Sequence, residues 1–308
     1  MKAVRIHKFG GPEVLTIDDV PVPEPKSGEA LVRVGAASVN PVDYKIRSGQ
    51  FPPVREKDLP ITLGRDLAGK VEKCGTDSGL KEGSDIIAML GWDRGSYAEY
   101  VIVRDGEAAT KPDRLSDEEG AAIPLAGLTA WQGLFDHGGL EKGQRVLIHG
   151  GAGGVGHFAI QFARWKGANI AATASREDLD FVRTLGAQEA IDYKNERFEE
   201  KVHDVDLVFD LIGGETQARS LAVLKPGGIL VSTLQAPDKE KLRQHGVRGT
   251  NYMAKPNSVE LADICRLISM GKVNPVISGR FPLNEAAQAQ EELEQGHVIG
   301  KIVLDCRV

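Results

Sequence analysis

Cysteine is scarce in this chain of 308 residues, which contains only three. Cys74, Cys265 and Cys306 lie far apart in the sequence and form no CxxC pair. This spacing excludes a dense disulfide framework and indicates a protein that works in a reducing compartment.

Long apolar runs and blocks of basic residues are also lacking. The first residues, MKAVRIHKFGGPEV, carry charges where a signal peptide needs its apolar region, and no uninterrupted apolar run is long enough to cross a bilayer. The formal net charge is −6, which gives no electrostatic footprint for nucleic acid. These absences predict a cytoplasmic protein with small soluble partners, and with no nucleic acid or membrane among them.

The first third of the chain has the pattern of an antiparallel β domain. With 41% hydrophobic and 27% charged residues, the composition is globular, and the length suits two domains. KAVRIHKFG alternates between apolar and polar residues, and EALVRVGAASVN is rich in β-branched residues. The connector between them, VPVPEPKSGE, contains prolines that a helix would not accommodate. We expect a β domain over residues 1–118.

The pattern changes near Leu115. Ser116 and Glu119 have the spacing of a capping box at the start of a helix. Short apolar strands then alternate with helical strings, which predicts parallel βαβ units and a doubly wound α/β domain over residues 119–258. The tail, residues 259–308, again has β content, so we expect it to complete the first domain. The expected strands are RVLIH, ANIAAT, EAIDY, VDLVFD, GILVST and GVRGTNYM.

Glycines are concentrated between the first of these strands and a helical string. Gly151, Gly153 and Gly156 fit the pattern G-x-G-x-x-G in a strand–turn–helix context. The first allows a tight turn, the second lets a pyrophosphate approach the backbone, and the third lets helix and strand pack closely. The alternative is a merely flexible glycine loop. The context favours a dinucleotide site whose turn also includes Gly154 and Val155.

The residues after the next strand indicate which dinucleotide is bound. A site for NAD usually has an acid about 20 residues beyond the glycines. Here Ser175 and Arg176 occupy that stretch, and the first carboxylates, Glu177 and Asp178, suit the first turn of a helix that a Ser175–Asp178 capping box would begin. A hydroxyl and a guanidinium suit a 2′-phosphate, so NADPH is favoured over NADH. The alternative for Arg176 is an exposed residue without a ligand.

Motifs along nearly the whole chain resemble those of one family. They are MKAVRIHKFGGPEVL, VNPVDYKIRSGQFP, LGRDLAGKV, GSYAEYVIV, PLAGLTAWQGL, GGAGGVG, LGAQEAIDY, LKPGGILVST and GKIVL. By these motifs the chain is similar to the zinc-free quinone oxidoreductases, the zeta-crystallin-like group of the medium-chain dehydrogenase/reductase superfamily. The resemblance implies a GroES-like β domain with an inserted Rossmann domain, an active site in the cleft between them, and NADPH-dependent reduction of quinones or other α,β-unsaturated carbonyl compounds.

Departures from the zinc-dependent relatives bear on the reaction. Those relatives carry a His where this chain has Arg65 and a Cys near Leu125, and neither residue present here can hold zinc. We therefore expect no metal site. Without a Lewis acid, the product anion must be delocalised, as it is after hydride addition to quinones and enones.

The segment VNPVDYKIRSG carries the expected catalytic residues. The resemblance implies that Asn40 approaches the nicotinamide ribose or a substrate oxygen. Relatives often place a Tyr two positions after the aspartate, where this chain has Lys45, with Tyr44 beside Asp43. The proton donor is thus Tyr44, Lys45 or solvent. In an extended segment only one of Tyr44 and Lys45 would face the cleft, and Asp43 is expected to be structural.

Three further residues are implied by the resemblance to lie near the cofactor. Thr129 would lie near the nicotinamide, Tyr193 beside the adenosine 2′-phosphate, and Lys301 close to the cofactor as well. The alternatives are a Thr129 hydroxyl bonded to a helix carbonyl, a Tyr193 that covers the sheet edge and a Lys301 that faces solvent.

Other functions and the assembly also follow from the resemblance. Relatives commonly dimerise through edge strands of their Rossmann sheets, here near GVRGTNYM, and an exposed strand edge is a template for such pairing.

The alternatives to quinone reduction are a 2-alkenal or carbonyl reductase with the same cofactor, and a non-catalytic NADPH-binding protein of the crystallin or sensor type.

Overall fold

The computed structural model describes residues 1–307 and divides them into two compact units. The first unit contains Met1–Leu125, Pro256–Gly271 and the chain from Pro275 onward. The second contains Ala126–Lys255 and the short segment Lys272–Asn274. The sequence predicts the boundaries between the β domain and the inserted α/β domain at residues 118/119 and 258/259.

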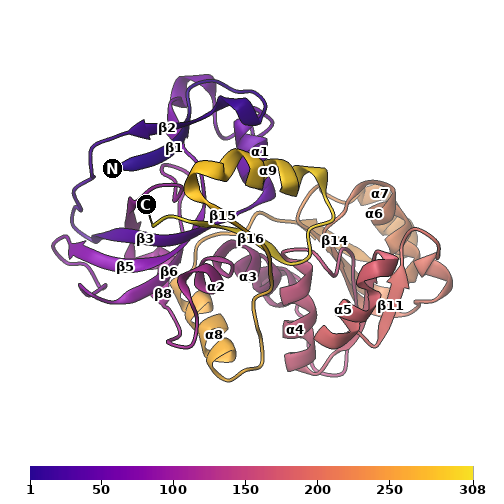
Figure 1. Cartoon of the computed structure of the whole chain (residues 1–308). Helices are drawn as coiled ribbons and strands as arrows, with labels where there is room; N and C mark the ends of the chain where they lie inside the picture. The colour runs from indigo at the N-terminus through magenta and orange to yellow at the C-terminus, as the bar shows by residue number, and fades with distance from the viewer. Residues whose placement is uncertain (308) are drawn as a thin grey trace. The chain divides into compact units, whose positions relative to one another are not determined.

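The first unit is built mainly from antiparallel strands (Figure 1). A small sheet has the order β2-β1-β4, and a larger one has the order β15-β16-β3-β5-β6-β8, with β7 also paired to β3. Among the strand pairs that the structure describes in this unit, only β15 and β16 run parallel. The strands are β1 (Lys2–Ile6), β2 (Leu15–Asp19), β3 (Glu29–Val39), β4 (Ile61–Thr62), β5 (Asp66–Cys74), β6 (Asp85–Met89), β7 (Tyr100–Arg104), β8 (Ala108–Thr110), β15 (Ile277–Pro282) and β16 (Lys301–Asp305).

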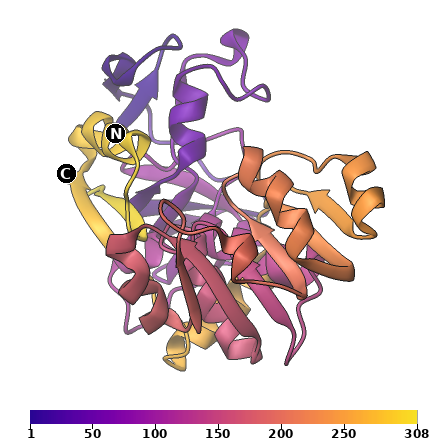
Figure 2. The ribbon, with the colours of Figure 1, turned by 90° about the vertical axis from the view of Figure 1, so that its right-hand side faces the viewer.

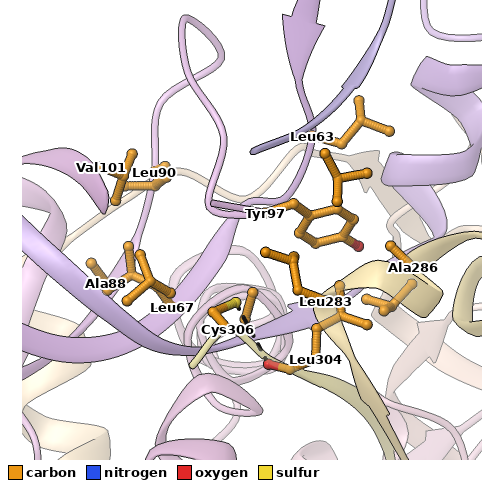
Figure 3. Close-up of a cluster of buried hydrophobic side chains, with 14 of the residues drawn as sticks. Leu63, Leu67, Ala88, Leu90, Tyr97, Val101, Leu283, Ala286, Leu304 and Cys306 are labelled. Carbon is orange, nitrogen blue, oxygen red and sulfur yellow. Dashed lines mark hydrogen bonds between the residues drawn. The ribbon is translucent and has the colours of Figure 1, made fainter. Parts of the chain in front are cut away.

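Strand β3 is the centre of this unit. It pairs with β5, β7 and β16, and the pairing of Val39 with Ile302 joins the two ends of the chain in one sheet. Apolar side chains from these strands pack with side chains from the neighbouring loops, turns and helices in one core, and Figure 3 shows Leu63, Tyr97 and Leu283 among them. Burial of this apolar surface is the main favourable contribution to the stability of the unit.

Short helices surround the sheets of the first unit. Helix α2 begins at the predicted capping box: the Ser116 hydroxyl accepts from the Glu119 backbone N–H at 3.2 Å, and the Glu119 carboxylate accepts from the Ser116 N–H at 2.9 Å. The helices are α1 (Pro41–Arg47), α2 (Asp117–Ala121), α8 (Ser258–Ser269) and α9 (Ala286–Gln295), with 3₁₀ turns at Pro12–Val14, Glu56–Asp58, Asp105–Glu107 and Leu283–Glu285.

The second unit contains one parallel sheet of order β11-β10-β9-β12-β13-β14. In chain order this is 3-2-1-4-5-6, the arrangement of dinucleotide-binding Rossmann sheets, and it confirms the predicted fold class. Every predicted strand is present. The strands are β9 (Arg145–Ile148), β10 (Asn169–Ala174), β11 (Glu189–Asp192), β12 (Val205–Asp210), β13 (Leu224–Ser232) and β14 (Arg248–Asn251).

Figure 2 shows helices packed around this sheet. They cover it because its strands carry buried apolar residues on both faces. Helix α4 packs against β9 and β10, and α5 against β10 and β11. No helix within residues 1–307 combines the length and apolar character that a membrane span requires. The helices are α3 (Pro124–Trp131), continued by a π-helix at Gln132–His137, α4 (Gly156–Lys166), α5 (Leu179–Leu185), α6 (Gly214–Ser220) and α7 (Lys239–His245), with 3₁₀ turns at Arg176–Asp178, Phe198–Glu200 and Leu221–Val223.

Candidate cofactor and active-site residues

The glycine turn joins the end of β9 to the start of α4, and packing explains several of its glycines. Gly150 has φ of +72°, a conformation that glycine adopts without steric cost. A Cβ on Gly151 would lie 3.0 Å from the Ile160 side chain, and a Cβ on Gly156 would lie 2.1 Å from the Gly150 carbonyl oxygen. Gly156 therefore allows the close contact between helix and strand that the pattern predicts.

Gly153 has a different environment. A Cβ there would meet one protein atom within 4 Å, the Gly150 carbonyl oxygen at 3.5 Å, which is an ordinary contact. Packing within the protein does not require a glycine at this position. The open space above its Cα, next to the N-terminal amides of α4, fits the close approach of a pyrophosphate.

Two buried side chains that the sequence did not single out hold the turn in place. The Thr173 hydroxyl accepts from the Gly150 N–H at 3.3 Å and lies 3.1 Å from His149 Nδ1. The other His149 ring nitrogen lies 2.9 Å from the Ser220 hydroxyl. Burial lowers the pKa of His149 to about 4, so the ring is neutral and structural at physiological pH.

The end of β10 carries the predicted Ser175 and Arg176. The Ser175 hydroxyl donates to the Asp178 carboxylate at 2.6 Å. The predicted Ser175–Asp178 capping box is wrong, because the hydroxyl caps no backbone N–H and the chain forms a 3₁₀ turn before α5 begins at Leu179. Arg176 is largely exposed, with 75% of its side chain accessible.

A carboxylate does lie beside Arg176, although the sequence predicted none. Arg176 Nε is 3.3 Å from Asp192 Oδ2 at the end of β11. Asp192 also accepts from Asn195 Nδ2 at 2.7 Å and from the Lys194 N–H at 3.0 Å. These bonds and the Arg176 charge keep its pKa below the ordinary value. The Asp192 carboxylate is therefore already bonded within its own loop, and the two terminal Arg176 nitrogens donate no hydrogen bond to the described residues.

Tyr193 lies in the same region of the second unit. Its backbone N–H donates to the Ala174 carbonyl at 3.1 Å, which joins the ends of β10 and β11, and its side chain is 55% exposed. Lys194 Nζ lies 5.8 Å from the ring centroid. The structure thus brings Ser175, Arg176 and Tyr193 together at one edge of the sheet.

Thr129 belongs to the second unit and is buried in α3. Its carbonyl oxygen accepts a hydrogen bond from the Tyr252 hydroxyl.

Asn40 and Lys301 meet in a buried polar cluster of the first unit. Lys301 Nζ donates to Asn40 Oδ1 and to the Val39 carbonyl oxygen, the latter at 3.1 Å. Asn40 Nδ2 donates to Asp66 Oδ2 at 2.9 Å. Burial raises the pKa of Asp66 and lowers that of Lys301. Lys301 is 4% exposed, so the alternative in which it faces solvent is wrong.

The segment after Asn40 is helical, and the expectation of an extended segment is wrong. Pro41 occupies the first position of α1, where its missing N–H costs nothing, and the Asn40 N–H donates to Asp43 Oδ2 at 2.8 Å. Tyr44 and Lys45 are therefore separated by about 100° around a helix axis. They do not face opposite sides of a strand, as the expected extended segment would require.

Asp43 and Tyr44 differ in their surroundings. Asp43 is completely buried and also accepts from the Tyr97 hydroxyl at 3.0 Å, and burial raises its pKa to about 7. Tyr44 is half-buried, and its hydroxyl has no hydrogen-bond partner within residues 1–307. Burial and the Glu294 charge raise the pKa of Tyr44, so the phenol keeps its proton at neutral pH.

No group of three or more His, Cys, Asp or Glu side chains that could hold a metal ion occurs within residues 1–307. At the positions expected from zinc-dependent relatives, Arg65 presents a guanidinium, and the backbone N–H of Leu125 donates to Asp66 Oδ1 at 2.8 Å.

Comparison with known proteins agrees with this architecture. Residues 26–113 match the alcohol dehydrogenase GroES-like domain, and residues 185–304 match a family described as zinc-binding dehydrogenase. The chloroplastic NADPH-dependent alkenal/one oxidoreductase of Arabidopsis thaliana is 37% identical over 317 residues, covering 99% of this chain and 79% of that protein.

Two solved structures are also similar over the whole chain. The quinone oxidoreductase from Coxiella burnetii is 38% identical, with a TM-score of 0.92 and coverage of 100% of this chain and 99% of that one. The Escherichia coli quinone oxidoreductase, solved with NADPH, is 28% identical, with a TM-score of 0.90 and coverage of 99% and 100%. The chain belongs to the quinone oxidoreductase group of the medium-chain dehydrogenase/reductase superfamily.

Proposed function

We propose that this protein is an NADPH-dependent oxidoreductase that reduces quinones or other α,β-unsaturated carbonyl compounds without zinc. The observation that carries the proposal is the pairing of an open glycine turn at Gly153 with an exposed Arg176 at the end of the next strand. The similar alkenal/one and quinone oxidoreductases support the reaction class.

The cofactor is NADPH, as in the E. coli relative. Residues of the turn from Gly151 to Gly156 would hold the pyrophosphate through backbone amides. Arg176 would bind the 2′-phosphate with its terminal nitrogens, while Asp192 holds the Nε side of the guanidinium. Ser175 and Tyr193 complete this edge, and we assign Thr129 and Lys301 to the nicotinamide end by the family pattern.

Reduced nicotinamide supplies a hydride when it is bound. The protein must then stabilise a delocalised enolate or phenolate, which a few fixed donors can do without a metal. Tyr44 is the candidate proton donor, because its hydroxyl is unpartnered and its raised pKa keeps it protonated. The Asn40 amide, held by Lys301 and Asp66, is the candidate for orienting the ribose or the substrate oxygen.

Two further parts of the proposal concern the assembly and the compartment. Strand β14 is one of the two edge strands of the parallel sheet, and we propose that two copies pair there to form a homodimer. We also propose a cytoplasmic location, from the low cysteine content.

A panel of acceptors tests the function. Purified protein, NADPH and 1,2-quinones, 1,4-quinones or enones are mixed under anaerobic conditions, and NADPH oxidation is followed with NADH as the control. Rapid oxidation of NADPH but not NADH is expected. Preference for 2-alkenals would favour the alkenal reductase, which the Arabidopsis relative supports. Binding of NADPH without turnover of any acceptor would favour a non-catalytic protein and reject the proposal.

A further inference from the structure

A pocket of about 350 Å³ opens in the first unit. Its volume lies at the lower end of the range of about 300–1,000 Å³ for small-molecule sites. Residues around β4, the loop 90–95 and β7 form its walls, and all its lining residues fall within residues 1–102. Its shape is therefore set by the first unit alone.

The charged residues that line this pocket, apart from Arg65, already have protein partners. Arg5 donates to the Pro60 carbonyl, Arg94 to the Ile102 carbonyl and to Glu107, Asp58 accepts from the Arg55 N–H, and Asp93 accepts from Arg104. Their placement is explained by bonds within the protein.

Arg65 is the exception. It is 2% exposed, and none of its three guanidinium nitrogens has a hydrogen-bond partner within the described residues. A buried guanidinium with unused N–H donors is costly. Three carboxylates lie near enough to act on Arg65 electrostatically, and none accepts a hydrogen bond from it. Asp66 accepts from Ser38 and Asn40, Asp43 accepts from the Asn40 N–H and Tyr97, and Glu107 accepts from Arg94. Burial lowers the pKa of Arg65 to about 10, so it stays cationic at neutral pH.

Trp92 covers this cation. The Arg65 guanidinium carbon lies 3.3 Å from the centroid of the indole, and Phe51 packs against the same indole with ring centroids 4.7 Å apart. Trp92 is nevertheless 39% exposed and lines the pocket beside Arg65. The flat indole stabilises the guanidinium by a cation–π contact but supplies no acceptor for its N–H groups.

We propose that this pocket binds a small aromatic carboxylate, with Arg65 as the partner of the carboxylate and Trp92 as a flat lid that shifts from the guanidinium when the ligand enters. The planar fork of N–H donors on Arg65 matches a carboxylate in a bidentate arrangement. Such a ligand would satisfy the donors that the protein leaves unused, and its ring would lie against the indole. The proposal does not depend on the proposed reaction, because the carboxylate would bind without the cofactor.

A charged probe and its neutral counterpart test the proposal in the unmodified full-length protein without NADPH. Naphthoate and naphthamide have nearly the same shape, and only naphthoate carries a charge. Calorimetry is expected to show at least about tenfold tighter binding of naphthoate, the size of a charge-assisted hydrogen bond. Equal affinities, or no binding of either probe, would overturn the proposal.

Variants separate Arg65 from the rest of the pocket. Arg65→Met is expected to remove the preference for naphthoate and leave the affinity for naphthamide unchanged, whereas Arg5→Gln, which changes a lining residue that is already bonded, keeps the preference. If Arg65→Met does not fold, Arg65→Lys serves instead, and the loss of the fork is expected to reduce the preference severalfold. A preference that persists unchanged in the folded Arg65 variant would overturn the assignment.

Tryptophan fluorescence tests the lid. Naphthoate is expected to change the emission of the wild type and to leave that of Trp92→Phe unchanged, although Trp131 and Trp165 remain. An equal change in both proteins would contradict the movement of Trp92.

Discussion

Arg176 Nε lies 3.3 Å from the Asp192 carboxylate, and these residues stand at the ends of the neighbouring strands β10 and β11. The pair orients the guanidinium while most of the Arg176 side chain stays exposed. An acid at this edge would favour the ribose hydroxyls of NAD. Because Asp192 is 2% exposed and bonded to Asn195, Arg176 is the group that an incoming cofactor meets.

Arg176→Ala is expected to raise the KM for NADPH by about tenfold and to change the KM for NADH little, because only NADPH has the 2′-phosphate. Arg183→Ala is the matched control, since Arg183 is an exposed arginine that pairs with Asp180. Steady-state kinetics with both cofactors measure the effect. Equal changes for NADPH and NADH would remove Arg176 from the phosphate site.

Two glycines of the same turn are expected to respond differently to alanine. Gly153→Ala introduces a methyl group that the protein tolerates, so its unfolding free energy should stay within about 1 kcal/mol of the wild type. NADPH affinity should fall by at least about tenfold, because the methyl group fills the space of the pyrophosphate.

Gly156→Ala serves as the contrast. Its methyl group would lie 2.1 Å from the Gly150 carbonyl oxygen, and overpacking of this kind should destabilise the protein by about 3 kcal/mol or more. Urea unfolding and NADPH titration distinguish the two variants. If Gly153→Ala binds NADPH like the wild type, the pyrophosphate does not lie over this turn.

The buried Asp43 predicts a dependence of stability on pH. Burial raises its pKa from 3.8 to about 7 in the folded protein, so the folded state holds a proton that the unfolded state has released. The stability from this group is fully present below about pH 4, decreases by at most about 1.4 kcal/mol per pH unit, and is lost as the pH rises through about 7.

Asp43→Asn tests this dependence, because asparagine cannot ionise. Urea unfolding at about pH 5 and about pH 8 should show a smaller loss of stability in the variant than in the wild type. Parallel losses in the two proteins would show that Asp43 does not titrate in this range.

Light scattering tests the proposed assembly. A mass of about twice that of the 33.2 kDa chain is expected, because β14 leaves one edge of the sheet unpaired within the chain. A monomer over the working concentration range would reject the dimer.

Local sequence signals predicted the fold well. The glycine pattern, the alternation of strands and helices, and the Ser116–Glu119 capping box depend on nearby residues, and the structure contains all three. The expectation of an extended segment after Asn40 is wrong because proline is favoured at the first position of a helix, where Pro41 begins α1.

The missed site features depend on contacts between distant residues. Asp192 lies 16 positions after Arg176 and reaches it only because β10 and β11 pair in parallel. The bonds of Lys301 to Asn40 likewise arise because β16 returns beside β3. No spacing rule in the sequence indicates such pairs.

Transfer of deuterium from labelled cofactor is a direct test of hydride transfer from NADPH to the substrate. The protein is incubated with an enone and NADPH that carries deuterium at the transferable position of the nicotinamide, and the product is analysed by mass spectrometry and NMR. One deuterium is expected at the β-carbon of the reduced enone. Reduced product without deuterium at that carbon, or no product from any enone or quinone offered, would contradict hydride transfer from NADPH.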